Sequence, residues 1–168
     1  MKVSLYMAIT ANGKIANKES DTSWISKESW ATYQQNVEAV DCVIIGRKTY
    51  EIMPSSEFLG KEYIVYTQEK NLDRKAKNII FTNEDPKKLI ASLKKRGLKN
   101  ILICGGGEIN GFFLTNDLID ELFLDVEPKV LGRGIELFGS FGGEANLELL
   151  GTKMLNKNTI QLHYKVIK

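Results

Sequence analysis

Three predicted strand ends carry glycine, basic or hydroxyl residues that could hold phosphate. They are Gly46-Arg47-Lys48-Thr49, Tyr66-Thr67-Gln68 and Gly105-Gly106-Gly107-Glu108. In open α/β sheets, ligands bind at the carboxyl ends of the strands. Two of the segments lead into predicted helices, whose free N–H groups and partial positive charge suit phosphate. A glycine after a strand is often only a turn, but the three segments together predict a dinucleotide site along one edge of a sheet.

Short apolar runs alternate with helical patterns and would position these segments. The predicted strands are residues 3–10, 42–45, 63–66, 78–81, 101–104 and 121–126, and the predicted helices are residues 26–40, 47–53, 86–96 and 107–114. This alternation predicts a mainly parallel sheet with flanking helices. Residues 12–26 and 129–143 are expected to be loops. Residues 147–155 and 159–167 alternate around Asn156-Lys157-Asn158, which predicts a C-terminal antiparallel hairpin.

Length and composition indicate one globular domain over residues 1–168. A chain of 168 residues with 43% apolar and 26% charged residues can bury a core of its own. The net charge of +2 favours neither a nucleic-acid partner nor a membrane surface. No apolar run reaches the roughly 18 residues of a membrane span. Cys42 and Cys104 lie in buried-strand patterns, so we expect reduced thiols in a cytoplasmic protein. The lone histidine, His163, argues against a metal site.

A dinucleotide fingerprint of the Rossmann type is nearly present but is rejected. Gly105-Gly-Gly-Glu-Ile-Asn110 approaches the pattern G-x-G-x-x-G, and Asp125 follows at about the spacing expected for the ribose-binding acid. The sixth position is Asn110 rather than glycine. The unit also comes late in the chain and is followed by a hairpin rather than by further βαβ units.

The order of these elements resembles the dihydrofolate reductase-like superfamily, which includes the reductase domain of the bifunctional riboflavin-biosynthesis deaminase-reductase. The resemblance covers nearly the whole chain and rests on residues 7–16, 43–50, 64–67, 105–107 and 122–125. It implies a single-domain dihydrofolate reductase-like α/β fold. It also implies an NADPH-dependent reductase that transfers a hydride to a C=N or C=O bond of a pterin, pyrimidine or related heterocycle. Members are often dimers, so a homodimer through the C-terminal hairpin is expected.

The resemblance also implies cofactor roles by position. The backbone groups of Ala8 and Ile15 would meet the nicotinamide carboxamide. The pyrophosphate and adenosine phosphate would lie against Gly46, Arg47, Lys48 and Thr49, the ribose phosphate beside Thr67, and the nicotinamide ribose and pyrophosphate against Gly105, Gly106 and Gly107. The nicotinamide would supply the hydride, and the protein would supply binding and orientation.

Four positions depart from the family patterns. Dihydrofolate reductases carry a carboxylate at the position of Ser29. Riboflavin-pathway reductases usually carry a lysine at the position of Tyr6 and a glutamate at that of Cys104. An arginine that often follows the glycine run is replaced by Glu108. These departures leave two alternatives open: a weak true dihydrofolate reductase, and a nucleotide-binding protein without efficient catalysis.

Glu28 and Asp125 are the candidate catalytic carboxylates. Glu28 is adjacent to Ser29, but helix geometry turns it about 100° away, and first-turn acids are also favoured by the helix dipole. Asp125 lies on a strand with one polar face, which points either to the cleft or to solvent. Tyr6 reaches the cleft if it shares a strand face with Ala8. Trp30 is expected in the core rather than on a ligand.

Overall fold

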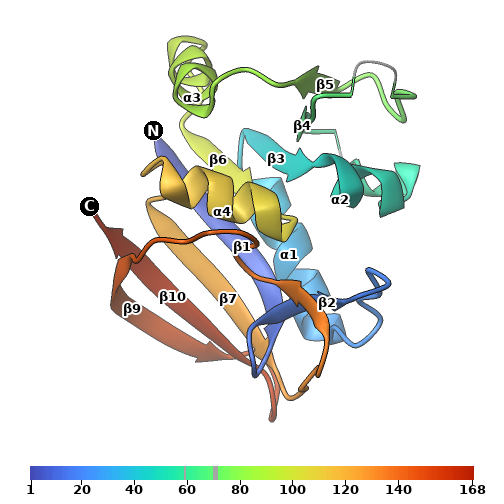
Figure 1. Ribbon diagram of the computed structural model, residues 1–168, viewed down its shortest axis with the longest axis vertical. Coiled ribbons are helices and arrows are strands. Elements are labelled where there is room, and N and C mark those ends of the chain that lie inside the picture. The colour runs from blue at the N-terminus through green and yellow to red at the C-terminus, as the bar shows by residue number, and fades with distance from the viewer. Residues whose placement is uncertain (59, 70–71) are drawn as a thin grey trace.

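The computed structural model describes residues 1–58, 60–69 and 72–168, and it contains one eight-stranded sheet (Figure 1). The strand order is β5-β4-β3-β6-β1-β7-β10-β9. The strands are β1 (Lys2–Thr10), β3 (Cys42–Gly46), β4 (Glu62–Tyr66), β5 (Ile79–Thr82), β6 (Asn100–Ile103), β7 (Glu121–Glu127), β9 (Asn146–Met154) and β10 (Ile160–Ile167). Neighbouring strands in the run β5-β4-β3-β6-β1-β7 are parallel to one another, while β10 is antiparallel to both β7 and β9. The predicted mainly parallel sheet and closing hairpin are confirmed.

Helices cover both faces of the sheet, as the alternation predicts. The helices are α1 (Lys27–Ala39), α2 (Arg47–Ile52), α3 (Pro86–Lys95) and α4 (Gly107–Thr115), with a short 3-10 turn, η1 (Ser55–Glu57). In Figure 1, α4 crosses in front of the sheet and α1 lies behind it. Leu93 and Phe113 bring α3 and α4 into one core, and Val37 and Tyr50 bring α1 and α2 into the other. The fold is therefore a three-layer α/β arrangement.

Strand β3 shows why the parallel region could be read from the sequence. Val43, Ile44 and Ile45 are all completely buried, with Ile44 in one core and its two neighbours in the other. A continuous apolar run is typical of a strand covered on both faces. Cys42 and Cys104 are buried and unpaired, as expected. None of the described helices is long and apolar enough to span a membrane.

Two segments that were expected to be loops form a second, two-stranded sheet. Strand β2 (Lys14–Asn17) pairs antiparallel with β8 (Gly134–Glu136), so the loop predictions over these residues are wrong. Strands this short show no periodicity in the sequence. Their pairing depends on a close approach, because a Cβ on Gly134 would lie 2.4 Å from the carbonyl oxygen of Ala16. This small sheet covers the rim of the cavities described next.

Candidate functional site

Two neighbouring cavities open at the carboxyl ends of the parallel strands. The larger has a volume of about 490 Å³ and the smaller about 230 Å³. Six residues line both cavities: Met7, Ile15, Thr22, Thr49, Ile52 and Cys104. Because their walls are shared, a ligand in one cavity would lie against a ligand in the other.

The larger cavity brings together almost all of the predicted cofactor residues. It is lined by Ile15, Gly46, Arg47, Lys48, Thr49, Thr67, Gly105, Gly106 and Gly107, while Ala8 lines the smaller cavity. These residues come from four separate chain segments that the sheet places side by side. The structure therefore brings these residues together around adjoining cavities, and their contacts with a cofactor stay a prediction.

Close backbone approaches explain the glycines at this edge. The amide of Gly46 donates to the carbonyl of Gly105 over 2.8 Å, which joins the ends of β3 and β6. A Cβ on Gly46 would lie 2.7 Å from Cγ1 of Ile109, and a Cβ on Gly107 would lie 2.2 Å from the carbonyl oxygen of Glu136. Helix α4 begins here without a side-chain cap. Its first N–H groups are therefore available to an anion.

The charged side chains at the larger cavity are partly paired. Arg47 Nη1 lies 2.6 Å from Glu51 Oε1, and Arg47 Nε lies 3.7 Å from Glu69 Oε2. Glu108, in the first turn of α4, accepts a hydrogen bond of 2.7 Å from Ser140 Oγ. Exposed ion pairs such as those of Arg47 are weak. Arg47 can therefore exchange its carboxylate partners for a phosphate at small cost.

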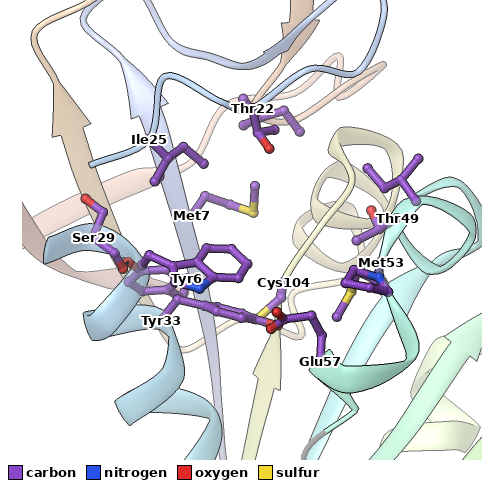
Figure 2. Close-up of a pocket in the computed structure, with 15 residues that line it drawn as sticks. Tyr6, Met7, Thr22, Ile25, Ser29, Tyr33, Thr49, Met53, Glu57 and Cys104 are labelled. Atoms are coloured by element: carbon purple, nitrogen blue, oxygen red, sulfur yellow. Dashed lines mark hydrogen bonds between the residues drawn. The ribbon is translucent and has the colours of Figure 1, made fainter. Parts of the chain in front are cut away.

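The smaller cavity has an aromatic wall. The ring centroids of Tyr6 and Tyr33 lie 6.0 Å apart, and those of Trp30 and Tyr33 lie 5.2 Å apart. Figure 2 shows Tyr6 and Tyr33 across the cavity from Thr22. The expectation that Trp30 packs in the core is wrong: it is 41% exposed and lines this cavity. Flat rings of this kind suit a planar ligand.

Glu57 is a cavity residue that the sequence analysis missed. It lies in η1, which has no motif to identify it, and its side chain extends toward Tyr33 in Figure 2. Within the described ranges, Glu57 is the only carboxylate and the only charged group among the residues that line the smaller cavity. Its oxygens are suited to accept hydrogen bonds from the N–H groups of a ligand.

Asp125 lies directly behind this aromatic wall and faces neither cavity nor solvent. It is completely buried, and it contacts the Tyr6 hydroxyl through Oδ2. Gln161 Nε2 donates to Asp125 Oδ1 over 2.7 Å. Burial raises the pKa of Asp125, and this outweighs the lowering effect of the hydrogen bonds from Tyr6 and Gln161. Tyr6 lines the cavity together with Ala8, as their shared strand face predicts.

A second buried carboxylate, Glu127, fixes the beginning of α1. Its Oε1 accepts hydrogen bonds from Ser26 N, Ser26 Oγ and Ser29 Oγ, and its Oε2 accepts one from Thr159 Oγ1. Burial acts to raise the pKa of Glu127, but these hydrogen bonds prevail and hold it below its usual range. Glu127 is not among the predicted site residues, because the predicted strand ends at Val126, one residue before the end of β7.

The structure does not bring Glu28 to the site. Glu28 is exposed, lines neither cavity and accepts a hydrogen bond of 3.2 Å from Asn156 Nδ2. Ser29 takes the cavity side of the helix instead, because adjacent helical residues point about 100° apart. The predicted catalytic role of Glu28 therefore has no geometric basis. His163 is also remote: it stacks on Phe123 and contacts Glu121.

Comparisons with known proteins identify relatives along the whole chain. A family model described as the RibD C-terminal domain matches residues 1–161. The uncharacterized protein YwjB of Bacillus subtilis (strain 168) is 35% identical over 170 residues, which is 97% of each chain. The uncharacterized protein YyaP of the same organism is 25% identical over 179 residues, covering 97% of this chain and 94% of the relative.

Solved structures share the fold. A putative riboflavin biosynthesis protein from Shewanella sp. PV-4 has a TM-score of 0.86 at 21% identity and covers 100% of both chains. A diaminohydroxyphosphoribosylaminopyrimidine deaminase/5-amino-6-(5-phosphoribosylamino)uracil reductase from Thermotoga maritima has a TM-score of 0.81 at 16% identity. That match covers 99% of this chain and 56% of the Thermotoga chain. At these identities the likeness describes the fold.

Proposed function

The chain belongs to the RibD C-terminal domain family, and we propose that residues 1–168 form one reductase domain that uses NADPH to reduce a small heterocycle. The observation that carries the proposal is the pair of adjoining cavities with shared walls. A two-substrate reductase needs its donor and acceptor in direct contact, since a near-attack distance is about 3–3.5 Å. The larger cavity would take the cofactor and the smaller one the acceptor.

The residues at the larger cavity fit a nicotinamide dinucleotide. Gly105, Gly106 and Gly107 leave backbone free at the N-terminus of α4, where the pyrophosphate would bind. Arg47 and Lys48 supply cations for the adenosine phosphate, which supports NADPH over NADH. When bound, the nicotinamide supplies the hydride. Ile15 and Thr49, on the shared wall, would orient it toward the smaller cavity.

The lining of the smaller cavity supports a planar acceptor without a phosphate group. Among the described residues that line it, none is lysine, arginine or histidine. A phosphate brought into this apolar cavity would lose hydration without gaining a cationic partner, which is costly. Glu57 would add like-charge repulsion and would instead accept hydrogen bonds from amino or ring N–H groups. The proposed acceptor is therefore a neutral, amino-bearing pterin or pyrimidine.

The test is a panel of acceptors assayed by the loss of absorbance of reduced nicotinamide. It compares a ribosylaminopyrimidine phosphate, its dephosphorylated form and dihydrofolate. We expect kcat/KM for the dephosphorylated pyrimidine to exceed that for the phosphate ester by about tenfold or more, equivalent to about 1.4 kcal/mol. A preference for the phosphate ester would refute the proposed acceptor class, and a preference for dihydrofolate would establish the dihydrofolate reductase alternative. Tight NADPH binding without any turnover would establish the non-catalytic alternative.

The edge strand β9 supports a homodimer. Leu147, Leu149 and Met154 are 42%, 54% and 57% exposed. Leu147 and Leu149 pair with Val166 and Tyr164 of β10, so the two leucines lie on one face of the hairpin. A long apolar edge strand is an association site unless it is covered. A second copy of the chain would cover it through an isologous contact.

Two free buried thiols support a cytoplasmic location.

A further inference from the structure

The Tyr6 hydroxyl contacts two groups that normally only accept hydrogen bonds. It lies 2.8 Å from the carbonyl oxygen of Ser29 and is also hydrogen-bonded to Asp125 Oδ2. A phenol carries one proton, so it can donate fully to one of these oxygens only. The carbonyl of Ser29 cannot carry a proton. Both contacts are satisfied when Asp125 is protonated, so that Asp125 donates to Tyr6 and Tyr6 donates to Ser29.

The surroundings of Asp125 favour its neutral form. It is completely buried, and Gln161 Nε2 donates to its other oxygen, which a neutral carboxylic acid also accommodates. Glu127, on the same strand, acts against a further negative charge on this pair. Burial raises the pKa of the Cys104 thiol beyond Tyr6, so this thiol stays neutral. The contacts therefore favour different states for the two carboxylates: a charged Glu127 at the start of α1 and a protonated Asp125.

Tyr6 connects this proton to the acceptor cavity. Tyr6 and Ser29 line the smaller cavity (Figure 2). Asp125 is not among the lining residues; it is buried and hydrogen-bonded to the Tyr6 hydroxyl. A rotation of the Tyr6 O–H bond away from the Ser29 carbonyl would offer its proton to a ligand atom that reaches Oη from the cavity, while Oη stays bonded to Asp125. Asp125, behind Tyr6, would thus take the place of the carboxylate that dihydrofolate reductases carry at the position of Ser29.

We propose that Asp125 and Tyr6 form a proton relay, in which Asp125 holds the proton in the resting protein and the Tyr6 hydroxyl delivers it to the acceptor. The proposal rests on the reductase function proposed above. The acceptor gains a hydride from the dihydronicotinamide at carbon and a proton from Tyr6 Oη at nitrogen or oxygen, so the C=N or C=O bond becomes CH–NH or CH–OH. Asp125 reprotonates Tyr6, is left as a carboxylate, and recovers its proton from water after product release.

The first arm of the test reads the proton without requiring turnover. The infrared difference spectrum, wild type minus the Asp125→Asn variant, should show the C=O band of a carboxylic acid at pH 7. This band should shift when H2O is replaced by D2O. The band should persist well above pH 3.9, about where an ordinary aspartate ionises. The amide introduced by Asp125→Asn is a neutral match that can donate to Tyr6 and accept from Gln161, so the variant should fold. Glu127→Gln is the matched control and should remove no such band. Absence of the wild-type band at pH 7 would overturn the proposal.

The second arm measures catalysis with the best acceptor of the panel. Asp125→Asn and Tyr6→Phe should each lower kcat by about 10²–10⁴-fold while the Kd for NADPH stays unchanged. Wild-type kcat should decline as the pH rises through the pKa of Asp125, and this limb should be lost in Asp125→Asn. A variant Asp125→Asn that keeps kcat within about twofold would overturn the relay, because general acid catalysis contributes far more. Absence of wild-type turnover with every acceptor would overturn the reductase function itself. The infrared spectra distinguish this outcome from an unprotonated Asp125, because they report the Asp125 proton without requiring turnover.

Discussion

The substitution Gly107→Ala tests whether the glycine run positions the proposed phosphate site. The new Cβ would lie 2.2 Å from the carbonyl oxygen of Glu136 and 3.1 Å from the amide nitrogen of Gly139, whereas ordinary contacts begin near 3.4 Å. Both neighbours are backbone atoms, so either the start of α4 or strand β8 must move by about 1 Å. Overpacking of this kind costs about 1–3 kcal/mol. For a chain of this size, 1 kcal/mol corresponds to about 2–4 °C in Tm.

Thermal unfolding followed by circular dichroism is the assay, with NADPH titration as a second readout. We expect Tm to fall by about 2–12 °C. We also expect the Kd for NADPH to rise by about tenfold or more, since a displaced helix start weakens hydrogen bonds worth about 1.5–3 kcal/mol. The control is Gly132→Ala, whose Cβ has nothing within 4 Å. A Gly107→Ala protein with the Tm and the Kd of this control would refute the steric reasoning.

Three further outcomes follow from the described contacts. Arg47→Ala should raise the Kd for NADPH about 5–30-fold but change the Kd for NADH little. The lost phosphate contact is worth about 1.5–3 kcal/mol, and part of it is offset because Arg47 gives up its weak ion pairs with Glu51 and Glu69 when it binds phosphate. Isothermal titration calorimetry measures both constants, with Arg96→Ala as the control. The lowered pKa of Glu127 means that its stabilisation is present above about pH 4.3 and is lost as pH falls through the folded pKa. Urea unfolding should therefore show wild type about 1.5–3 kcal/mol more stable than Glu127→Gln at pH 7, with the gap closing in acid. Leu149→Glu should convert a dimer to a monomer in light scattering, while Val130→Glu, at a 70% exposed position outside β9, should not.

The sheet was predictable because its signals are local. Continuous apolar runs such as residues 42–45 indicate strands that are buried on both faces, and glycine with basic residues marks the strand ends. The small sheet of β2 and β8 was missed because its pairing is decided by contacts between residues more than 100 positions apart in sequence. Gly134, for example, allows the approach to Ala16, but in sequence it is one of several glycines in a loop-like stretch.

The lining of the larger cavity was predictable, and that of the smaller cavity was not. Motifs continuous in sequence, such as Gly46-Arg47-Lys48-Thr49, line the larger cavity. The smaller cavity instead combines single residues from distant segments, including Glu57 from η1 and Trp30 from α1. The roles of Asp125 and Glu127 depend on which donors the fold places against each carboxylate. No spacing in the sequence distinguishes the two.

The assignment of the larger cavity to the cofactor is tested most directly by an NADPH titration followed through backbone amide resonances of the labelled protein. We expect saturable binding with the largest shifts at Gly46, Thr67 and residues 105–107, and with smaller shifts at the residues that line both cavities. Shifts centred on the β9–β10 hairpin, or no saturable binding, would contradict the assignment of the larger cavity to the cofactor. That result would leave the fold in place but remove the basis for a reductase.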